Sequence, residues 1–182
     1  MKIPTKTKRT VICGLCIALC YVLPIAFHSI GLGSVLSPMH IPVLLCGLVC
    51  GGGYGALCGL ACGVVGPVLS SLLSSMPPAM ALIWMVPELA IYGLVAGLLM
   101  RCLPVKHFYG KVYAALAIAM VAGRVAGGIA SALFHLGTAG SYTLSMFVSS
   151  YIVGSLPGIA AHLILVPVLV FTLVKTKAVS KV

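Results

Sequence analysis

Acidic side chains are almost absent from this sequence. Asp and Glu together occur once in 182 residues, and charged residues of all kinds make up 7% of the chain, whereas soluble domains carry about 25%. So few charges cannot coat a surface that faces water, so we expect most of the protein to face lipid. A single acid also excludes catalysis by paired carboxylates. The sequence has no Gly-rich phosphate loop with its Lys, so we expect neither ATP hydrolysis nor another enzymatic activity.

Hydrophobic residues make up 62% of the chain and form long continuous runs. Within lipid, backbone groups must bond to one another, which leaves helices or a closed barrel. Barrel strands alternate in polarity and these runs do not, so we predict an all-α integral membrane protein with six transmembrane helices. Residues 1–182 are expected to form one domain. The six helices are predicted at about 9–28, 40–51, 54–75, 80–102, 111–136 and 144–174.

The last predicted helix contains prolines, and they are expected to distort it. Pro157 precedes Gly158, and Pro167 follows ten residues later. A proline inside a helix removes a backbone donor and clashes with the preceding turn. We therefore expect a kink near residue 157, or a helix in two pieces.

Basic residues fix the expected orientation. Apart from Arg124, every Lys and Arg lies where an apolar run meets the same side of the membrane, and the connections at about 29–39, 75–80 and 137–143 contain none. Cytoplasmic loops carry the excess of Lys and Arg, so both termini are predicted to be cytoplasmic. Because these charges sit at helix ends, we expect no nucleic-acid partner. No small-residue cleavage site follows the first run, which is expected to be a retained helix.

Two charged side chains remain at membrane depth, Glu88 and Arg124. A charge there costs at least about 2.5 kcal/mol and usually faces a cavity or a partner. Two interpretations stay open. The two residues pair and hold their helices together, or one or both face a watery pocket and bind a polar substrate.

Histidines crowd the predicted outer side of the membrane. His28 and His40 flank the first outer loop, His135 ends the fifth predicted helix, and His162 lies deeper on the sixth. A lone buried histidine usually has a structural role, but several on one side favour a shared polar pocket. His40, His135 and His162 are therefore candidate substrate-binding residues.

Two aromatic residues flank the single acid at helical spacing. Trp84 lies one turn before Glu88 and Tyr92 one turn after it, so the three share a helix face. Trp84 suits an interface anchor, and both residues also suit a pocket that stacks a flat or apolar part of a ligand.

Small residues form further patterns. Cys46/Cys50 and Cys58/Cys62 have a spacing that can hold a soft metal ion. We favour apolar packing instead, and expect no metal, cofactor or disulfide in the reducing cytoplasmic half. Gly14-x-x-x-Ala18 in the first helix is typical of close helix contacts, within the chain or with a partner.

Several segments, in this order, resemble the membrane-embedded substrate-binding component of energy-coupling factor (ECF) transporters. The resemblance extends over about residues 10–170. It is carried by Pro38-Met39-His40-Ile41-Pro42, Gly55-Ala56-Leu57-x-Gly59-Leu60, Met76-Pro77-Pro78, Glu88-Leu89-Ala90-x-Tyr92-Gly93 and Leu156-Pro157-Gly158-Ile159.

This resemblance implies a multi-pass protein of the bacterial cell membrane with a site near its extracellular face. Such components dock through small residues of their first helix onto a transmembrane coupling protein, which two cytoplasmic ATPases drive, and they reorient in the membrane to release substrate. The family's docking pattern is Ala-x-x-x-Ala. Here Gly14 and Ala18 stand in its place, a departure at the first position.

The resemblance also implies a vitamin or vitamin precursor as substrate. It is closest to members linked with pantothenate, whose carboxylate Arg124 would neutralise. Pyridoxine, hydroxymethylpyrimidine or a queuosine precursor would instead use Glu88 and Trp84. The alternative function is a stand-alone secondary transporter or channel with Glu88 as its ion site.

Overall fold

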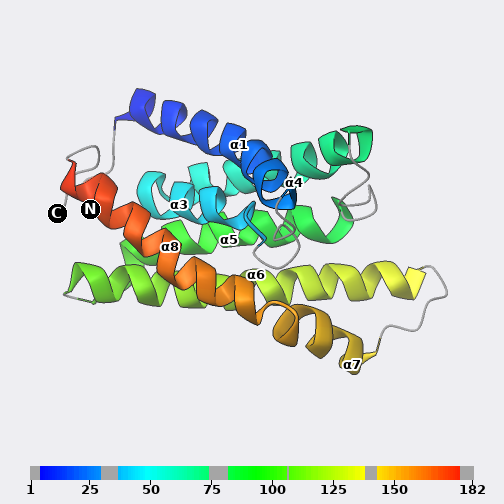
Figure 1. The fold of residues 1–182 in the computed structure, drawn as a ribbon. Coiled ribbons are helices and arrows are strands. Elements are labelled where there is room, and N and C mark those ends of the chain that lie inside the picture. The colour runs from blue at the N-terminus through cyan, green and yellow to red at the C-terminus, as the bar shows by residue number, and fades with distance from the viewer. Residues whose placement is uncertain (1–4, 30–36, 74–81, 106, 138–142, 177–182) are drawn as a thin grey trace.

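A computed structural model of the protein describes residues 5–29, 37–73, 82–105, 107–137 and 143–176. Within these ranges the regular structure is entirely helical (Figure 1). The expected all-α class is confirmed for this part of the chain. The predicted outer connections lie largely outside it, including the Met76-Pro77-Pro78 motif.

The first three helices lie close to their predicted positions. They are α1 (Lys6–Ser29), α3 (His40–Cys50) and α4 (Gly52–Leu73). A single residue, Gly51, separates α3 from α4 and has a φ of 96°. Residues with a side chain rarely adopt this backbone conformation, so a glycine at this position permits the tight reversal between the two helices.

The next two helices also match their predictions, but the last predicted helix is divided. Helices α5 and α6 cover Leu82–Cys102 and Phe108–Gly137. The final segment consists of α7 (Leu144–Phe147), a π-helix, η2 (Val148–Val153), and α8 (Leu156–Lys175).

The break lies at Gly154 and Ser155, slightly before the expected kink at Pro157. Pro157 stands in the first turn of α8. A proline is tolerated there because the first N–H groups of a helix have no partner inside the helix. The helix therefore restarts just before this proline instead of bending at it.

In the part of the chain that the structure describes, four helices are long and apolar enough to cross a membrane: α1 over Lys6–Phe27, α5, α6 and α8. A span needs about 20 residues, and α3, with 11 residues, is shorter. Helix α4 is apolar over Gly52–Val68 and also falls below that length in this stretch. Six spans therefore stay a prediction, as does the side of the membrane on which the termini lie.

The helices pack in an order that places α3 and α5 in the interior. Helix α5 packs between α4 and α6, α3 packs against α1, α4 and α5, and α8 crosses α3 and α6 (Figure 1). At Gly55 and Gly93 the α4 and α5 backbones touch, and an added Cβ at either position would collide with the other backbone. These glycines allow the close approach of the two helices.

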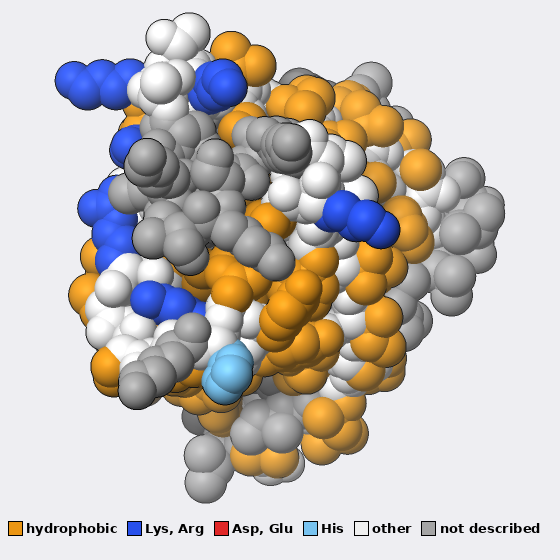
Figure 2. Space-filling model, turned by 90° about the vertical axis from the view of Figure 1, so that its left-hand side faces the viewer, with side chains coloured by type: hydrophobic (Ala, Val, Ile, Leu, Met, Phe, Trp, Pro, Cys, Tyr) orange, Lys and Arg blue, Asp and Glu red, His pale blue; other side chains and the backbone are white. Residues whose placement is uncertain are grey.

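Basic residues gather at one end of the bundle. This end holds the start of α1, the end of α5, the start of α6 and the end of α8, at the left of Figure 1. Arg101 lies in the last turn of α5, and Lys175 ends α8. Figure 2 faces this end and shows Lys and Arg side chains spread around it. This distribution agrees with the charge separation on which the predicted orientation depends.

Candidate functional site

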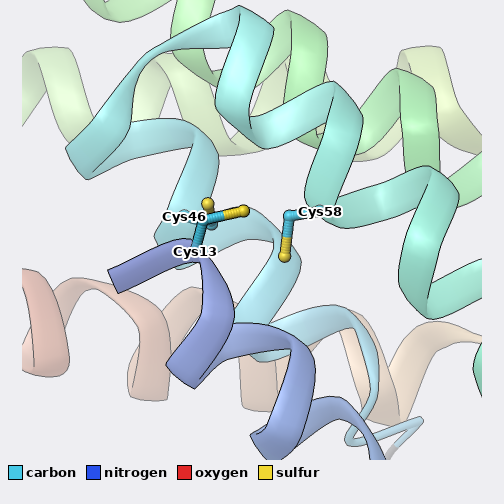
Figure 3. Close-up of side chains that lie close together, drawn as sticks. All are labelled: Cys13, Cys46 and Cys58. Atoms are coloured by element: carbon cyan, nitrogen blue, oxygen red, sulfur yellow. The ribbon is translucent and has the colours of Figure 1, made fainter. Parts of the chain in front are cut away.

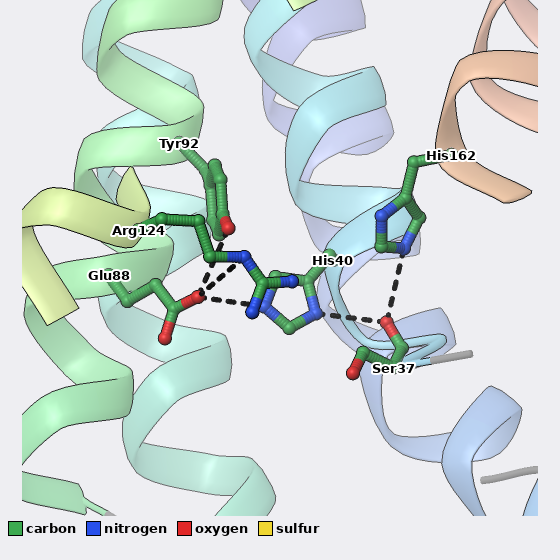
Figure 4. Close-up of polar contacts among 6 residues, drawn as sticks. All are labelled: Ser37, His40, Glu88, Tyr92, Arg124 and His162. Atoms are coloured by element: carbon green, nitrogen blue, oxygen red, sulfur yellow. Dashed lines mark hydrogen bonds and ion pairs between the residues drawn. The ribbon is translucent and has the colours of Figure 1, made fainter. Parts of the chain in front are cut away.

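The carboxylate of Glu88 lies at the centre of a buried polar cluster (Figure 4). Three side chains from three helices meet its Oε1 atom. The hydroxyl of Tyr92, one turn along α5, donates a hydrogen bond of 3.1 Å. Nε2 of His40 on α3 lies 3.5 Å away, and Nε of Arg124 on α6 lies 3.7 Å away. The only acid of the chain is thus an anchor for three helices.

Two glycines on α6 make room for this arrangement. A Cβ at Gly127 would lie 2.8 Å from Oε2 of Glu88, and one at Gly123 would lie 2.6 Å from the Tyr92 ring. Gly123 and Gly127 are one helical turn apart, as are Glu88 and Tyr92 on the facing helix. Two large polar side chains therefore fit between closely packed helices because the facing positions carry no side chain.

The backbone carbonyl of Ser37 forms a second centre. It accepts hydrogen bonds from Nδ1 of His40 at 2.9 Å and from Nε2 of His162 at 3.3 Å (Figure 4). It also accepts the backbone N–H of His40 at 3.1 Å. Ser37 has a φ of 43°, in the left-handed region that residues other than glycine rarely adopt. This conformation directs the Ser37 carbonyl toward both histidines. Through the hydrogen bond from His162, the carbonyl links α8 to the start of α3.

His40 connects the two centres. One ring nitrogen contacts the Ser37 carbonyl and the other faces the Glu88 carboxylate. Its ring lies edge-on to Tyr92, with centroids 5.1 Å apart, and tilted against His162 at 5.5 Å. The His40 ring therefore contacts the rings of both Tyr92 and His162.

Arg124 has fewer polar contacts than its burial would normally require. Its side chain is 14% exposed, and buried polar groups almost always have hydrogen-bond partners. Among the described residues, its Nε–H is buried with no hydrogen bond, and Glu88 is its one ionic partner. The guanidinium has five N–H donors in a planar fork suited to a carboxylate. One donor of this guanidinium, Nε–H, therefore has no acceptor among the described residues.

Trp84 and His135 occupy a different place from the other predicted site residues. Both rings contact Phe134, with centroids 6.2 Å and 5.6 Å away. Nδ1 of His135 donates to the Ser131 carbonyl at 2.8 Å, one turn back along α6. The structure thus brings together His40, Glu88, Tyr92, Arg124 and His162, and places Trp84 and His135 around Phe134.

Three features in and beside the cluster could not be identified as functional from sequence. The Ser37 carbonyl carries no sequence signal, because any residue has one. Gly123 and Gly127 resemble ordinary helix-packing glycines, and only their match to the Glu88–Tyr92 spacing hints at another role. Phe134 is one apolar residue among many in α6.

The predicted docking residues lie on an open face of α1. An added Cβ at Gly14 would meet nothing within 4 Å, and Ala18 is exposed. The same helix exposes large apolar side chains before and after this pair, including Val11 at 66% and Val22 at 55%. At Gly14, no other described part of the chain packs against this face of α1. The face is therefore available to lipid or to a partner protein.

Comparison with protein-family models gives a match over most of the chain. The model of the family described as "ECF transporter, substrate-specific component" matches residues 8–177. No curated protein and no solved structure gives a significant match.

Proposed function

Because the chain belongs to the family of ECF transporter substrate-specific components, we propose that it captures a vitamin or vitamin precursor from outside the cell. Components of this family are membrane-embedded, substrate-specific subunits of importers, which supports a transport function and not an enzymatic one. The proposal adds the substrate class and the site, which is the cluster around Glu88 and Arg124. Pantothenate is the first candidate substrate.

One buried donor without a hydrogen bond, the Nε–H of Arg124, supports this choice of substrate and site. Oε1 of Glu88 already receives contacts from Tyr92, His40 and Arg124. The Arg124 contact is an ion pair at 3.7 Å from Nε, and this Nε–H has no hydrogen-bond acceptor among the described residues. A ligand with a carboxylate would supply acceptors to the guanidinium in a charge-assisted pair. A cationic ligand would have to compete with Arg124 for Glu88.

Pantothenate fits this chemistry because it carries one carboxylate together with hydroxyl and amide groups. The carboxylate would meet Arg124, and the tyrosine and histidine side chains of the cluster would bind the neutral polar groups. A flat neutral or cationic vitamin would favour the region of Trp84, whose ring lies against Phe134. The choice between these ligands is therefore a choice between two neighbouring parts of α5 and α6.

Delivery is the second part of the proposal. The chain would dock through the Gly14–Ala18 face of α1 onto a coupling membrane protein that two ATPases energise, and would reorient to release substrate inside. Two observations support this. The face is open at Gly14, and the two charges at membrane depth lie within 3.7 Å of each other, which lowers the cost of moving them through lipid.

Equilibrium binding to the purified chain tests the substrate and the site. The full chain in detergent, without nucleotide, is expected to bind one vitamin of a panel at a stoichiometry of one, and Arg124→Gln should abolish binding of an anionic one. Arg101→Gln is the matched control, because Arg101 is exposed at the end of α5. Failure to bind any panel member, or equal loss in both variants, would refute the proposed site.

Reconstitution separates this function from the alternative of a stand-alone carrier. Proteoliposomes containing only this chain should show no net uptake, and uptake should require the energising module and ATP. Uptake by the chain alone, abolished by Glu88→Gln, would instead identify a secondary transporter or channel that uses Glu88 as its ion site.

A further inference from the structure

Seven of the eight cysteines are buried where α1, α3 and α4 pack together. The eighth, Cys102, is exposed at the end of α5. The buried thiols and their exposed fractions are Cys13 8%, Cys16 2%, Cys20 2%, Cys46 0%, Cys50 1%, Cys58 0% and Cys62 1%. The three helices thus enclose a sulfur-rich interior that the proposed substrate site does not use.

Within this interior, Cys13, Cys46 and Cys58 converge. Their Sγ atoms all lie within 4.8 Å of one another, although each comes from a different helix (Figure 3). Sequence spacing indicates pairs on single helices, such as Cys46/Cys50 and Cys58/Cys62, for which packing is the simpler explanation. The participation of Cys13 from α1 is a three-dimensional feature that spacing cannot reveal.

We propose that Cys13, Cys46 and Cys58 form a binding site for a soft metal ion, with monovalent copper as the best fit. Metal–sulfur bonds of about 2.3 Å place sulfurs that share one ion about 3.8–4.0 Å apart. The three thiols therefore need to approach by less than about 1 Å, which rotation about their Cα–Cβ bonds can supply.

The number and type of ligands select the metal. Sulfur ligands without nitrogen or oxygen select soft ions such as Cu(I). Structural zinc usually takes four ligands, and the group of mutually close metal ligands ends at three in the part of the chain that the structure describes. Each thiol that coordinates the ion loses its proton to the solvent.

Packing alone is the competing explanation. The thiols of Cys13 and Cys46 both approach the Tyr54 carbonyl, at 3.8 Å and 3.6 Å, and Cys58 lies 3.9 Å from Cys62. Weak hydrogen bonds of this kind suffice to satisfy buried thiols. The two explanations differ in one respect: only a binding site holds the ion against a competitor and loses it when any one of the three sulfurs is removed.

Titration of the full chain with Cu(I) tests the proposal. Under oxygen-free conditions in detergent, with a chromophoric Cu(I) chelator as competitor, wild type should retain one ion per chain. Cys13→Ala, Cys46→Ala and Cys58→Ala should each lower its affinity at least tenfold. Cys102→Ala, which removes the exposed cysteine, should bind like wild type. No retention by wild type, retention by the three variants, or equal loss in Cys102→Ala would overturn the proposal.

X-ray absorption of copper-loaded wild type provides a test that does not depend on the folding of variants. Three sulfur neighbours at about 2.3 Å are expected. Nitrogen or oxygen neighbours would place the ion elsewhere and refute the site. Because the ion would join three helices, copper should also raise the unfolding temperature of wild type and of Cys102→Ala alike.

Discussion

Replacement of Glu88 by Gln should destabilise the protein strongly, although glutamine has nearly the same side-chain shape as glutamate. Glutamine can still accept the 3.1 Å hydrogen bond from Tyr92, so the main loss is the negative charge. Arg124, with a side chain 14% exposed, would then hold a positive charge with no counter-charge among the described residues. Loss of one partner of a buried ion pair costs about 3–5 kcal/mol. For a chain of this length, we expect the unfolding temperature to fall by roughly 6–20 °C.

A double-mutant cycle shows whether this cost comes from the pair. Arg124→Gln should cost less than Glu88→Gln, because an isolated buried carboxyl can take up a proton and an arginine cannot lose one. The double variant should be more stable than the sum of the two single losses predicts, because it leaves no uncompensated charge. Because Glu88→Gln alone leaves the Arg124 charge uncompensated and the double variant does not, we also expect the double variant to be more stable than Glu88→Gln.

Thermal unfolding in detergent, followed by the fluorescence of Trp84, measures all four proteins of the cycle. Trp84 is the single tryptophan of the chain, so the signal comes from α5 itself. Arg101→Gln serves as the control for removal of an exposed arginine. If Glu88→Gln unfolds within about 1 °C of wild type, or if the two single losses simply add, the pair does not stabilise the bundle as argued.

Three further predictions concern helix contacts. Gly55→Ala should prevent folding or lower the unfolding temperature by more than 10 °C, because its Cβ would collide with the α5 backbone, whereas Gly53→Ala, which meets nothing within 4 Å, should be tolerated. Gly14→Leu should leave vitamin binding unchanged but abolish co-purification with the energising module; normal co-purification would refute the docking face. His162→Ala should weaken substrate binding and cost about 0.5–1.5 kcal/mol by removing one of the three hydrogen bonds to the Ser37 carbonyl; unchanged affinity would exclude a role in binding.

Helix positions could largely be predicted from the sequence because apolar length and terminal charge determine them. Helix α5 was expected at about 80–102 and covers Leu82–Cys102. The division before α8 is harder to predict, since Pro157 is compatible both with a kink and with the first turn of a new helix. The choice depends on how the preceding residues pack, and they form a π-helix here.

The candidate site could be predicted in part, because charges are so rare at membrane depth that Glu88 and Arg124 are evident. The side chains that contact these two residues are harder to predict. Trp84 and Tyr92 share a helix face with Glu88, but the Trp84 ring lies against Phe134 while Tyr92 bonds to the carboxylate. Helical spacing gives the face but not the side-chain direction. The direction of a backbone carbonyl such as that of Ser37 depends on the local φ value, which composition and spacing do not predict.

The most direct test of the account compares two ligands that differ by one charge. Pantothenate and its alcohol analogue, in which a hydroxymethyl group replaces the carboxylate, should be titrated against wild type and Arg124→Gln in detergent. We predict that wild type binds the acid at least tenfold more tightly than the alcohol, and that Arg124→Gln loses this preference. Equal binding of the two ligands by wild type, or a preference for the acid that survives Arg124→Gln, would contradict the account.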